Sequence, residues 1–275
     1  MFIILIAIEN NHTEVFELFI NDNLQWTMQW NLKNKKGNTS PCIAFKYGDD
    51  RLIKKLLKIE DIDLNIIDED NLSFLMIITV RNLYNILKLV ISNNEINWNL
   101  IDNFGDSVAT YAVKSNSYDC FSILIQINHI NWNIQNISGN TPAIYSIISN
   151  NQEVFKILLN TNTINWNICN KENQTPLSLS IINKNDYFFL NLIQNKNVMI
   201  NIEDLDKLGL LSLAANKLLS YIRSKMNKES FSAKNNIYNE LLFALKTNYN
   251  KSIIQILIFK TTNDDILKFV INSKT

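Results

Sequence analysis

The chain has 275 residues, and its 26 basic and 26 acidic side chains give a formal net charge of zero. Hydrophobic residues make up 47% of the sequence and charged residues 19%, the balance of an ordinary globular protein. A neutral chain lacks the long-range attraction to phosphate that binders of nucleic acids and anionic membranes use. Only 5 Gly and 3 Pro occur, which disfavours collagen-like, linker-rich and many-turned all-β architectures.

The N-terminal apolar run, Phe2 to Ile8, ends at Glu9 and has neither a basic stretch before it nor a small-residue cleavage site after it. It is therefore not expected to be a signal peptide. No window of the chain approaches the roughly 18 apolar residues that a membrane-spanning helix needs. The cysteines are odd in number and far apart, which argues against a disulfide framework and for a reducing, cytoplasmic location. They are Cys42, Cys120 and Cys169.

Tryptophans mark an internal repeat. Trp98, Trp132 and Trp166 are 34 residues apart, and each lies in the string Ile-Asn-Trp-Asn. An apolar residue followed by Asn recurs in this register at Trp30, Leu64, Trp98, Trp132, Trp166 and Ile200. Self-similarity at such a period predicts stacked repeats, each of which packs on its neighbours, in place of one central core.

A turn follows each of these positions. Its first column is always Asn or Asp: Asn34, Asp68, Asp102, Asn136, Asn170 and Asp204. Three residues later come Gly37, Asn71, Gly105, Gly139, Asn173 and, as an exception, Lys207. Gly, Asn and Asp tolerate turns and left-handed backbone, so we predict a tight hairpin-like connection in each repeat.

Two helices are predicted after each turn. In the best-preserved repeat Thr141 and Pro142 begin the first helix, and Pro suits this place because its missing N–H has no partner there. Asn150 is placed to end that helix, and residues 153–159 have the spacing of a second helix with one buried face. The corresponding stop positions in the earlier repeats are Gly48, Asn82 and Asn116.

These strings resemble the ankyrin repeat family over about residues 1 to 215. The resemblance is carried by Gly139-Asn140-Thr141-Pro142-Ala143, by Gln174-Thr175-Pro176-Leu177 and by Gly209-Leu210-Leu211-Ser212-Leu213-Ala214-Ala215. It implies an all-α, ankyrin-type solenoid of stacked helix-turn-helix repeats with short hairpin-like connections. It also implies a non-catalytic scaffold for protein-protein interaction, which binds a partner on its concave face and hairpin tips.

The sequence departs from that family in three respects. Thr-Pro occurs in only two repeats, and each repeat is one residue longer, with the addition before the tryptophan column. The family's first-helix His is also replaced, so its hydrogen bonds must be absent or made differently. The replacing residues are Cys42, Met76, Thr110, Ile144, Ser178 and Ser212.

We predict a repeat array over residues 1–215, with a partial first unit, and a divergent repeat with a C-terminal helical cap over 216–275. Residues 1–10 would form a first helix without a preceding hairpin, so the chain begins either with a cap or inside a truncated repeat. The apolar face of this segment favours truncation or a preceding domain, because a capping repeat needs a polar outer face. If the array belongs to a larger enzyme or effector, its role would be to select the target.

A search for catalytic, metal-binding or cofactor-binding constellations finds none. The chain has no Gly-rich phosphate loop, and its histidines, His12 and His129, lie in different repeats that do not touch. Cys120 and His129 share a repeat, but Cys120 lies among apolar residues of the second helix. We therefore expect neither an enzyme nor a zinc site, and no cofactor.

The remaining basic clusters are interpreted as solvated helix faces. One lies in the second repeat and one near the C-terminal end of the array; their members are Lys54, Lys55 and Lys58, and Lys217, Arg223, Lys225 and Lys228.

Two groups of apolar residues need an interpretation. The tryptophan column could form an exposed binding ladder or pack between repeats; we favour packing, because Leu64 can replace a buried filler but not an aromatic platform. Phe104 and Ile137 lie at predicted hairpin tips, where they could bind a partner or pack against each other. The candidate partner-binding residues are Asn103, Phe104, Ile137, Ser138, Lys171 and Glu172. We expect a protein partner, no nucleic acid and no membrane, and a monomer or a segment of a longer chain.

Overall fold

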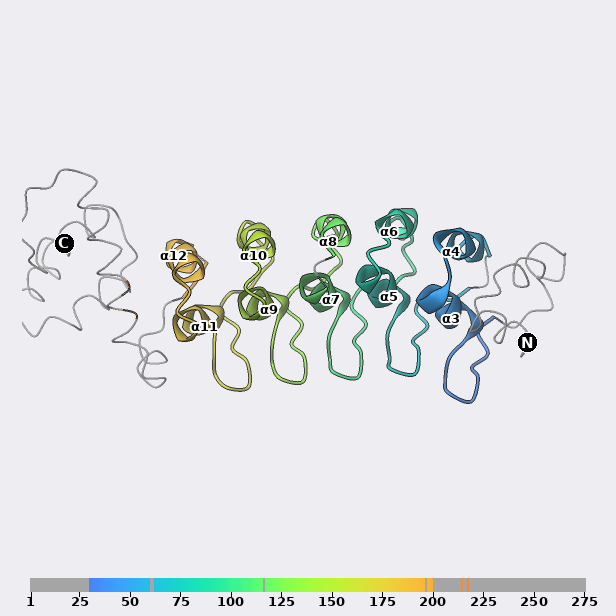
Figure 1. Ribbon diagram of the computed structural model, residues 1–275, viewed down its shortest axis with the longest axis horizontal. Coiled ribbons are helices and arrows are strands. Elements are labelled where there is room, and N and C mark those ends of the chain that lie inside the picture. The colour runs from blue at the N-terminus through green and yellow to red at the C-terminus, as the bar shows by residue number, and fades with distance from the viewer. Residues whose placement is uncertain are drawn as a thin grey trace, which may run out of the picture. The chain divides into compact units, whose positions relative to one another are not determined.

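The computed structural model describes residues 30–59, 62–115, 117–195 and 197–199, together with Ala214 and Lys217. These residues form helices joined by long loops (Figure 1). They contain no β-strand, and their only β-structure is two isolated bridges at the bases of hairpins. The prediction of an all-α fold is confirmed. The predicted first helix at residues 1–10 and the C-terminal segment 216–275 lie outside the described residues, apart from Lys217.

The described helices alternate between two positions in the repeat. The first helices are α3 (Ser40–Tyr47), α5 (Phe74–Val80), α7 (Val108–Lys114), α9 (Pro142–Ile148) and α11 (Pro176–Ile182). The second helices are α4 (Asp50–Leu56), α6 (Tyr84–Val90), α8 (Tyr118–Leu124), α10 (Gln152–Leu159) and α12 (Asp186–Gln194).

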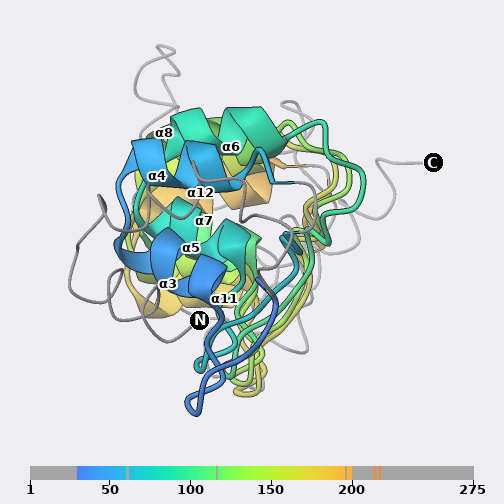
Figure 2. The same ribbon diagram turned by 90° about the vertical axis from the view of Figure 1, so that its right-hand side faces the viewer.

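The chain divides into two compact units, residues 1–149 and 150–275. In the first unit α3, α5, α7 and α9 lie side by side in one layer, and α4, α6 and α8 form a second layer (Figures 1 and 2). The hairpins project from the first layer, away from the second (Figure 1). In the second unit α11 packs on α12, and the ring centroid of Phe155 on α10 lies 4.7 Å from that of Phe188 on α12.

The Asn/Asp column organises each hairpin. In the third described hairpin, Oδ1 of Asp102 accepts hydrogen bonds from the backbone N–H groups of Phe104 and Asp106, both at 2.8 Å. The same pair of bonds, to the residues two and four positions later, recurs at Asn34, Asp68, Asn136 and Asn170. Asn and Asp are needed because both have a short side chain with an oxygen that can close this turn.

The left-handed turn column is also confirmed. All five described members have a positive φ, which Gly adopts without strain and Asn adopts more easily than most residues. The angles are 88° at Gly37, 59° at Asn71, 75° at Gly105, 76° at Gly139 and 58° at Asn173.

The helix starts follow from their caps. Thr141 precedes α9, its hydroxyl accepts the N–H of Ile144, and Pro142 occupies the first turn, as predicted. The described residues that replace the family's first-helix His are all buried; they are Cys42, Met76, Thr110, Ile144 and Ser178. Ser178 makes different hydrogen bonds in this place: its hydroxyl donates to the carbonyl of Thr175, and its N–H donates to the hydroxyl of Thr175.

Gly48 differs from the other helix stops. Asn82 and Asn150 are left-handed, with φ of 52° and 53°, as expected for Asn that ends a helix. Gly48 does end α3, as predicted, but it caps the helix with extended backbone, at φ of −69° and ψ of 158°. The position needs glycine for a steric reason. A Cβ there would lie 2.5 Å from the carbonyl oxygen of Ala44 and 2.7 Å from Cδ2 of Leu52.

The tryptophan column is part of the core. Trp30, Trp98, Trp132 and Trp166 are at most 5% exposed. Trp132 packs on Phe121 of α8 in the first unit, and Trp166 packs on Phe155 of α10 in the second. The packing interpretation is confirmed, since buried indoles cannot form an exposed binding ladder.

Candidate functional site

Hairpin tips and the exposed side of the first helices form the candidate surface of the first unit. Phe104 is 61% exposed and Ile137 is 55% exposed, so the side chains of these two tip residues are not buried against each other. Their backbones are joined, since the N–H of Ile137 donates to the carbonyl of Phe104 at 2.8 Å. The tips therefore present apolar side chains from backbone that is held in place.

The other predicted tip residues are exposed as well. The side-chain oxygen of Asn103 accepts a hydrogen bond from Nδ2 of Asn71 in the preceding hairpin, and the N–H of Ser138 donates to Asn136 at 3.0 Å. Lys171 and Glu172 lie at a hairpin tip of the second unit, and both are exposed. The structure thus brings Asn103, Phe104, Ile137 and Ser138 onto adjacent tips of one unit.

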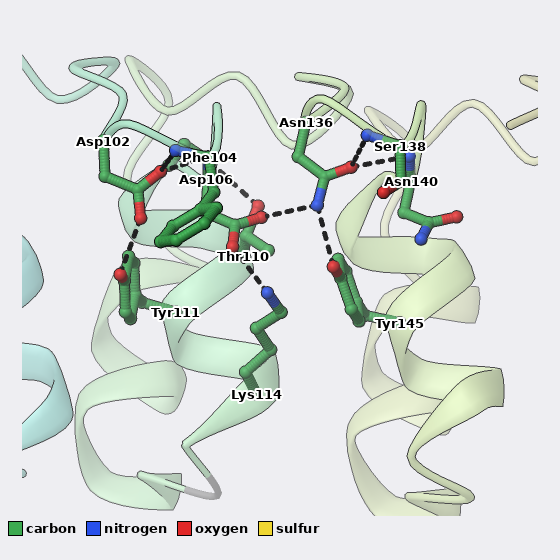
Figure 3. A network of polar contacts seen from close by, with 11 residues as sticks. Asp102, Phe104, Asp106, Thr110, Tyr111, Lys114, Asn136, Ser138, Asn140 and Tyr145 are labelled. Atoms are coloured by element: carbon green, nitrogen blue, oxygen red, sulfur yellow. Dashed lines mark hydrogen bonds and ion pairs between the residues drawn. The ribbon is translucent and has the colours of Figure 1, made fainter. Parts of the chain in front are cut away.

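A polar network supports these tips from below (Figure 3). The Tyr111 hydroxyl on α7 donates to Oδ2 of Asp102 at 2.7 Å. Burial, and secondly this hydrogen bond to a carboxylate, raises the pKa of Tyr111 well above its ordinary value. Tyr111 therefore stays protonated and fixes the third described hairpin to its own helix.

Asp106 connects two repeats. Its buried carboxylate forms an ion pair with Lys114 at the end of α7 and accepts a hydrogen bond from Nδ2 of Asn136 at 2.9 Å (Figure 3). The same amide group donates to the hydroxyl of Tyr145 on α9 at 2.7 Å. The buried carboxylate thus has two partners, a cation of its own repeat and an amide of the next, and this pairing sets the spacing between the two hairpins.

Lys114 lies at the surface end of this network. Its ammonium nitrogen is 4.2 Å from the centroid of the Tyr145 ring, within cation–π distance. Burial alone lowers the pKa of Lys114, but the hydrogen bonds to Asp106 and Tyr145 outweigh it, so the pKa is raised. Lys46 has the equivalent place in the first described repeat, where it contacts Asp68 at 3.2 Å and Asp70 at 3.6 Å.

Helix residues that were not predicted from the sequence also belong to this surface. Val80 and Ile148 occupy the same helix position as Lys46 and Lys114, and both are about half exposed. Together with the half-buried Tyr111 and Tyr145 they place partly exposed apolar side chains on the first helices. Helical periodicity could have found them, because the residues two positions earlier are fully buried; these are Ala44, Ile78, Ala112 and Ser146.

The chemistry around Cys120 is that of a core thiol. Cys120 is buried in α8, and burial raises its pKa to about 12. A nucleophilic cysteine needs a lowered pKa and access to solvent, and Cys120 has neither property. Within the part of the chain that the structure describes, no three His, Cys, Asp or Glu side chains are placed to hold a metal ion. None of the helices described is long and apolar enough to cross a membrane.

In a comparison with protein families, residues 41–136 and 110–204 of the chain match the family model described as ankyrin repeats (three copies). The chain belongs to the ankyrin repeat family, and the stacked helix pairs are ankyrin repeats. Ankyrin repeats are generally protein-interaction modules. The search of curated proteins finds no match to this chain.

Solved structures show the same fold. The ankyrin repeat protein EF0377 is similar with a TM-score of 0.62 and 19% sequence identity, over 70% of this chain and 97% of that one. An ankyrin repeat domain from Acinetobacter baumannii AYE is similar with a TM-score of 0.60 and 17% identity, over 70% of this chain and 96% of that one. The predicted ankyrin-type solenoid is confirmed by these matches.

Proposed function

We propose that this chain is a non-catalytic protein-interaction module whose first unit binds a partner protein through its hairpin tips and first helices. The proposal rests chiefly on the exposure of Phe104 and Ile137 at adjacent tips. Exposed apolar side chains on ordered backbone lose little entropy when they are buried against a partner, so they contribute efficiently to affinity.

The surroundings of the tips support the same proposal. Tyr111 and Tyr145 supply half-buried aromatic rings with fixed hydroxyls, and aromatic residues are enriched among those that dominate binding energy. Lys114 and the exposed Asp70 supply charges of both signs near the apolar area. This mixture suits a folded protein surface or an ordered loop better than a nucleic-acid backbone, which would require an excess of positive charge.

A comparison of variants tests this proposal. Wild-type chain and a Phe104→Ser/Ile137→Ser variant are used as baits in extract from the native cells, and the affinity of any captured protein is then measured. We expect the variant to keep the wild-type helicity and unfolding midpoint. Its affinity for the partner should fall by about tenfold or more, which corresponds to about 1.4 kcal/mol of binding free energy.

Met199→Ser is the matched control, because Met199 is an exposed apolar residue of the second unit and belongs to neither candidate surface of the first unit. It should retain the partner that the tip variant loses. Equal capture by wild type and tip variant would contradict the proposal, and so would loss of folding in the tip variant, which would make the two residues part of the packing.

We also infer a reducing, cytoplasmic location. Cys42 and Cys120 are buried in separate repeats, and burial raises the pKa of both thiols, so they have the character of core side chains. Fluorescence microscopy of the tagged chain in its own cells tests this inference, and signal from an oxidising compartment would contradict it.

A further inference from the structure

A groove of about 550 Å³ lies between α4 and α6. Both helices belong to the layer that faces away from the hairpin tips (Figure 1). The groove belongs wholly to the first unit and shares no residue with the tip surface. Its lining consists of Lys54, Leu57, Lys58, Leu64, Leu89, Val90 and Asn93.

The groove has a specific origin in the sequence. Leu64 occupies the tryptophan column, where Trp98 and Trp132 are almost completely buried. Leu64 is only half-buried, and it lines the groove. Because leucine is smaller than tryptophan, the repeat that carries Leu64 leaves open a volume at the position that an indole fills in the following two repeats.

The lining is apolar at the bottom and positive at the edge. Val90 is buried and, with Leu64, forms the floor, while Leu89 is 56% exposed beside it. Lys54 and Lys58 are exposed at the rim, and no carboxylate is among the lining residues. This local excess of positive charge contrasts with the zero net charge of the whole chain.

These features define the chemistry of an occupant. A bulky apolar side chain would fill the volume that Leu64 leaves, and acidic side chains close to it would pair with Lys54 and Lys58. Side chains three or four residues apart on a helix lie on one face, so an amphipathic helix can present an aromatic residue together with flanking Glu or Asp. We propose that the groove is a second docking site, which takes an acidic amphipathic helix of a partner protein.

A synthetic peptide tests the site directly. The probe is an acidic amphipathic helix of about 15 residues, near the lower limit for an isolated helix, with one central Trp and Glu one turn away on either side. Its copy with Lys in place of Glu is the charge control. Fluorescence anisotropy of dye-labelled peptide against the full chain should show binding of the acidic peptide and at least about tenfold weaker binding of the Lys copy.

Two kinds of variant locate the binding. Leu64→Trp should fill the groove, as tryptophan does in the other repeats, and should keep or raise the unfolding midpoint. Its affinity for the acidic peptide should fall by about tenfold or more. Lys54→Glu/Lys58→Glu should no longer bind the acidic peptide and should bind the Lys copy instead, because the charge at the rim of the groove becomes negative. The reversed preference stays informative even if Leu64→Trp perturbs the fold.

Matched controls separate this site from the tip surface. Lys156→Glu, a charge reversal at an exposed position on α10, and Phe104→Ser/Ile137→Ser should both bind the peptide as wild type does. The proposal is overturned if wild type does not bind the acidic peptide, or if Leu64→Trp binds it equally well. Loss of binding in the tip variant would assign the peptide to the tips. A concentration-dependent dimer in sedimentation that Leu64→Trp abolishes would assign the groove to a second copy of the chain.

Discussion

The indole of Trp132 meets the ring of Phe121 edge-on, with ring centroids 5.7 Å apart and ring planes 85° apart. Both side chains are almost fully buried, so this contact joins the loop that ends one repeat to the second helix of the same repeat. Edge-to-face aromatic pairs add to the stabilisation that comes from burial alone.

Truncation of this pair should destabilise the first unit. Trp132→Ala removes a large buried aromatic side chain, and we expect the free energy of unfolding to fall by about 3–5 kcal/mol. Urea unfolding followed by circular dichroism measures the change. Phe104→Ala, at an exposed tip, is the control and should change the midpoint little; an unchanged midpoint for Trp132→Ala would contradict the core assignment.

A second prediction concerns an asparagine that bridges neighbouring repeats. Nδ2 of Asn99 donates to the carbonyl of His129 at 2.8 Å, and its Oδ1 accepts the N–H of Asn131 at 2.7 Å. Asn99→Ala removes both hydrogen bonds and should cost about 1–3 kcal/mol, at roughly 0.5–1.5 kcal/mol for each. Asn99→Asp should cost at least as much at neutral pH, because a carboxylate oxygen would then face the carbonyl of His129.

Hydrogen exchange at the amide of Asn131 measures this effect locally, since loss of the acceptor should speed exchange there. Asn97→Ala is the control, because the side chain of Asn97 accepts only the N–H of Asn99 within its own repeat among the bonds identified. Equal destabilisation by the changes at positions 97 and 99 would argue against a special role for the bridge between repeats.

Two glycines of the turn column give a third prediction. Gly37 and Gly105 both have a left-handed backbone, but a Cβ at Gly37 would meet nothing within 4 Å, whereas at Gly105 it would lie 3.0 Å from Cα of Asn136. Gly37→Ala should therefore cost only the conformational strain, about 1–2 kcal/mol. Gly105→Ala adds a clash with the next hairpin and should cost about 2–4 kcal/mol. Thermal unfolding of the two variants compares these costs, and equal losses would mean that the neighbouring hairpin moves aside freely.

A fourth prediction concerns alkaline pH. Burial raises the pKa of Cys120 from 9.0 to about 12, so the stabilisation from its protonated thiol is fully present below pH 9 and is lost as pH rises through the folded-state pKa. Between pH 9 and 12 the free energy of unfolding should fall by up to about 1.4 kcal/mol for each pH unit from this group. The raised pKa of Tyr111 adds a fall in the same direction above pH 10.

Urea unfolding at several pH values between 8 and 11 measures this slope. Cys120→Ala should lower the stability at pH 8 through the lost packing, but it should make the decline above pH 9 shallower. A decline as steep as that of wild type would show that Cys120 does not contribute to the alkaline instability.

Periodicity made the repeat predictable. The turn geometry restricts the residue types in the columns of Asp102 and Gly105. The first column requires a side-chain oxygen that closes the turn, and the second requires a residue that accepts positive φ. Both restrictions are local, so they can be recognised within a single repeat. Gly48 shows the limit of this reasoning. Its residue type matched the column, but the close approach of Leu52 decided its role, and that approach depends on how two helices pack.

The sequence by itself determined the architecture, because each repeat carries its own turn, cap and buried positions, and repetition makes these signals unambiguous. It also placed Phe104 and Ile137 at exposed tips. Only the tertiary structure decided that Asp106 joins Lys114 to Asn136 across two hairpins, and that Leu64 leaves a groove beside Lys54. Those outcomes depend on distances between side chains of different helices and neighbouring repeats, which stacking sets and local sequence does not encode.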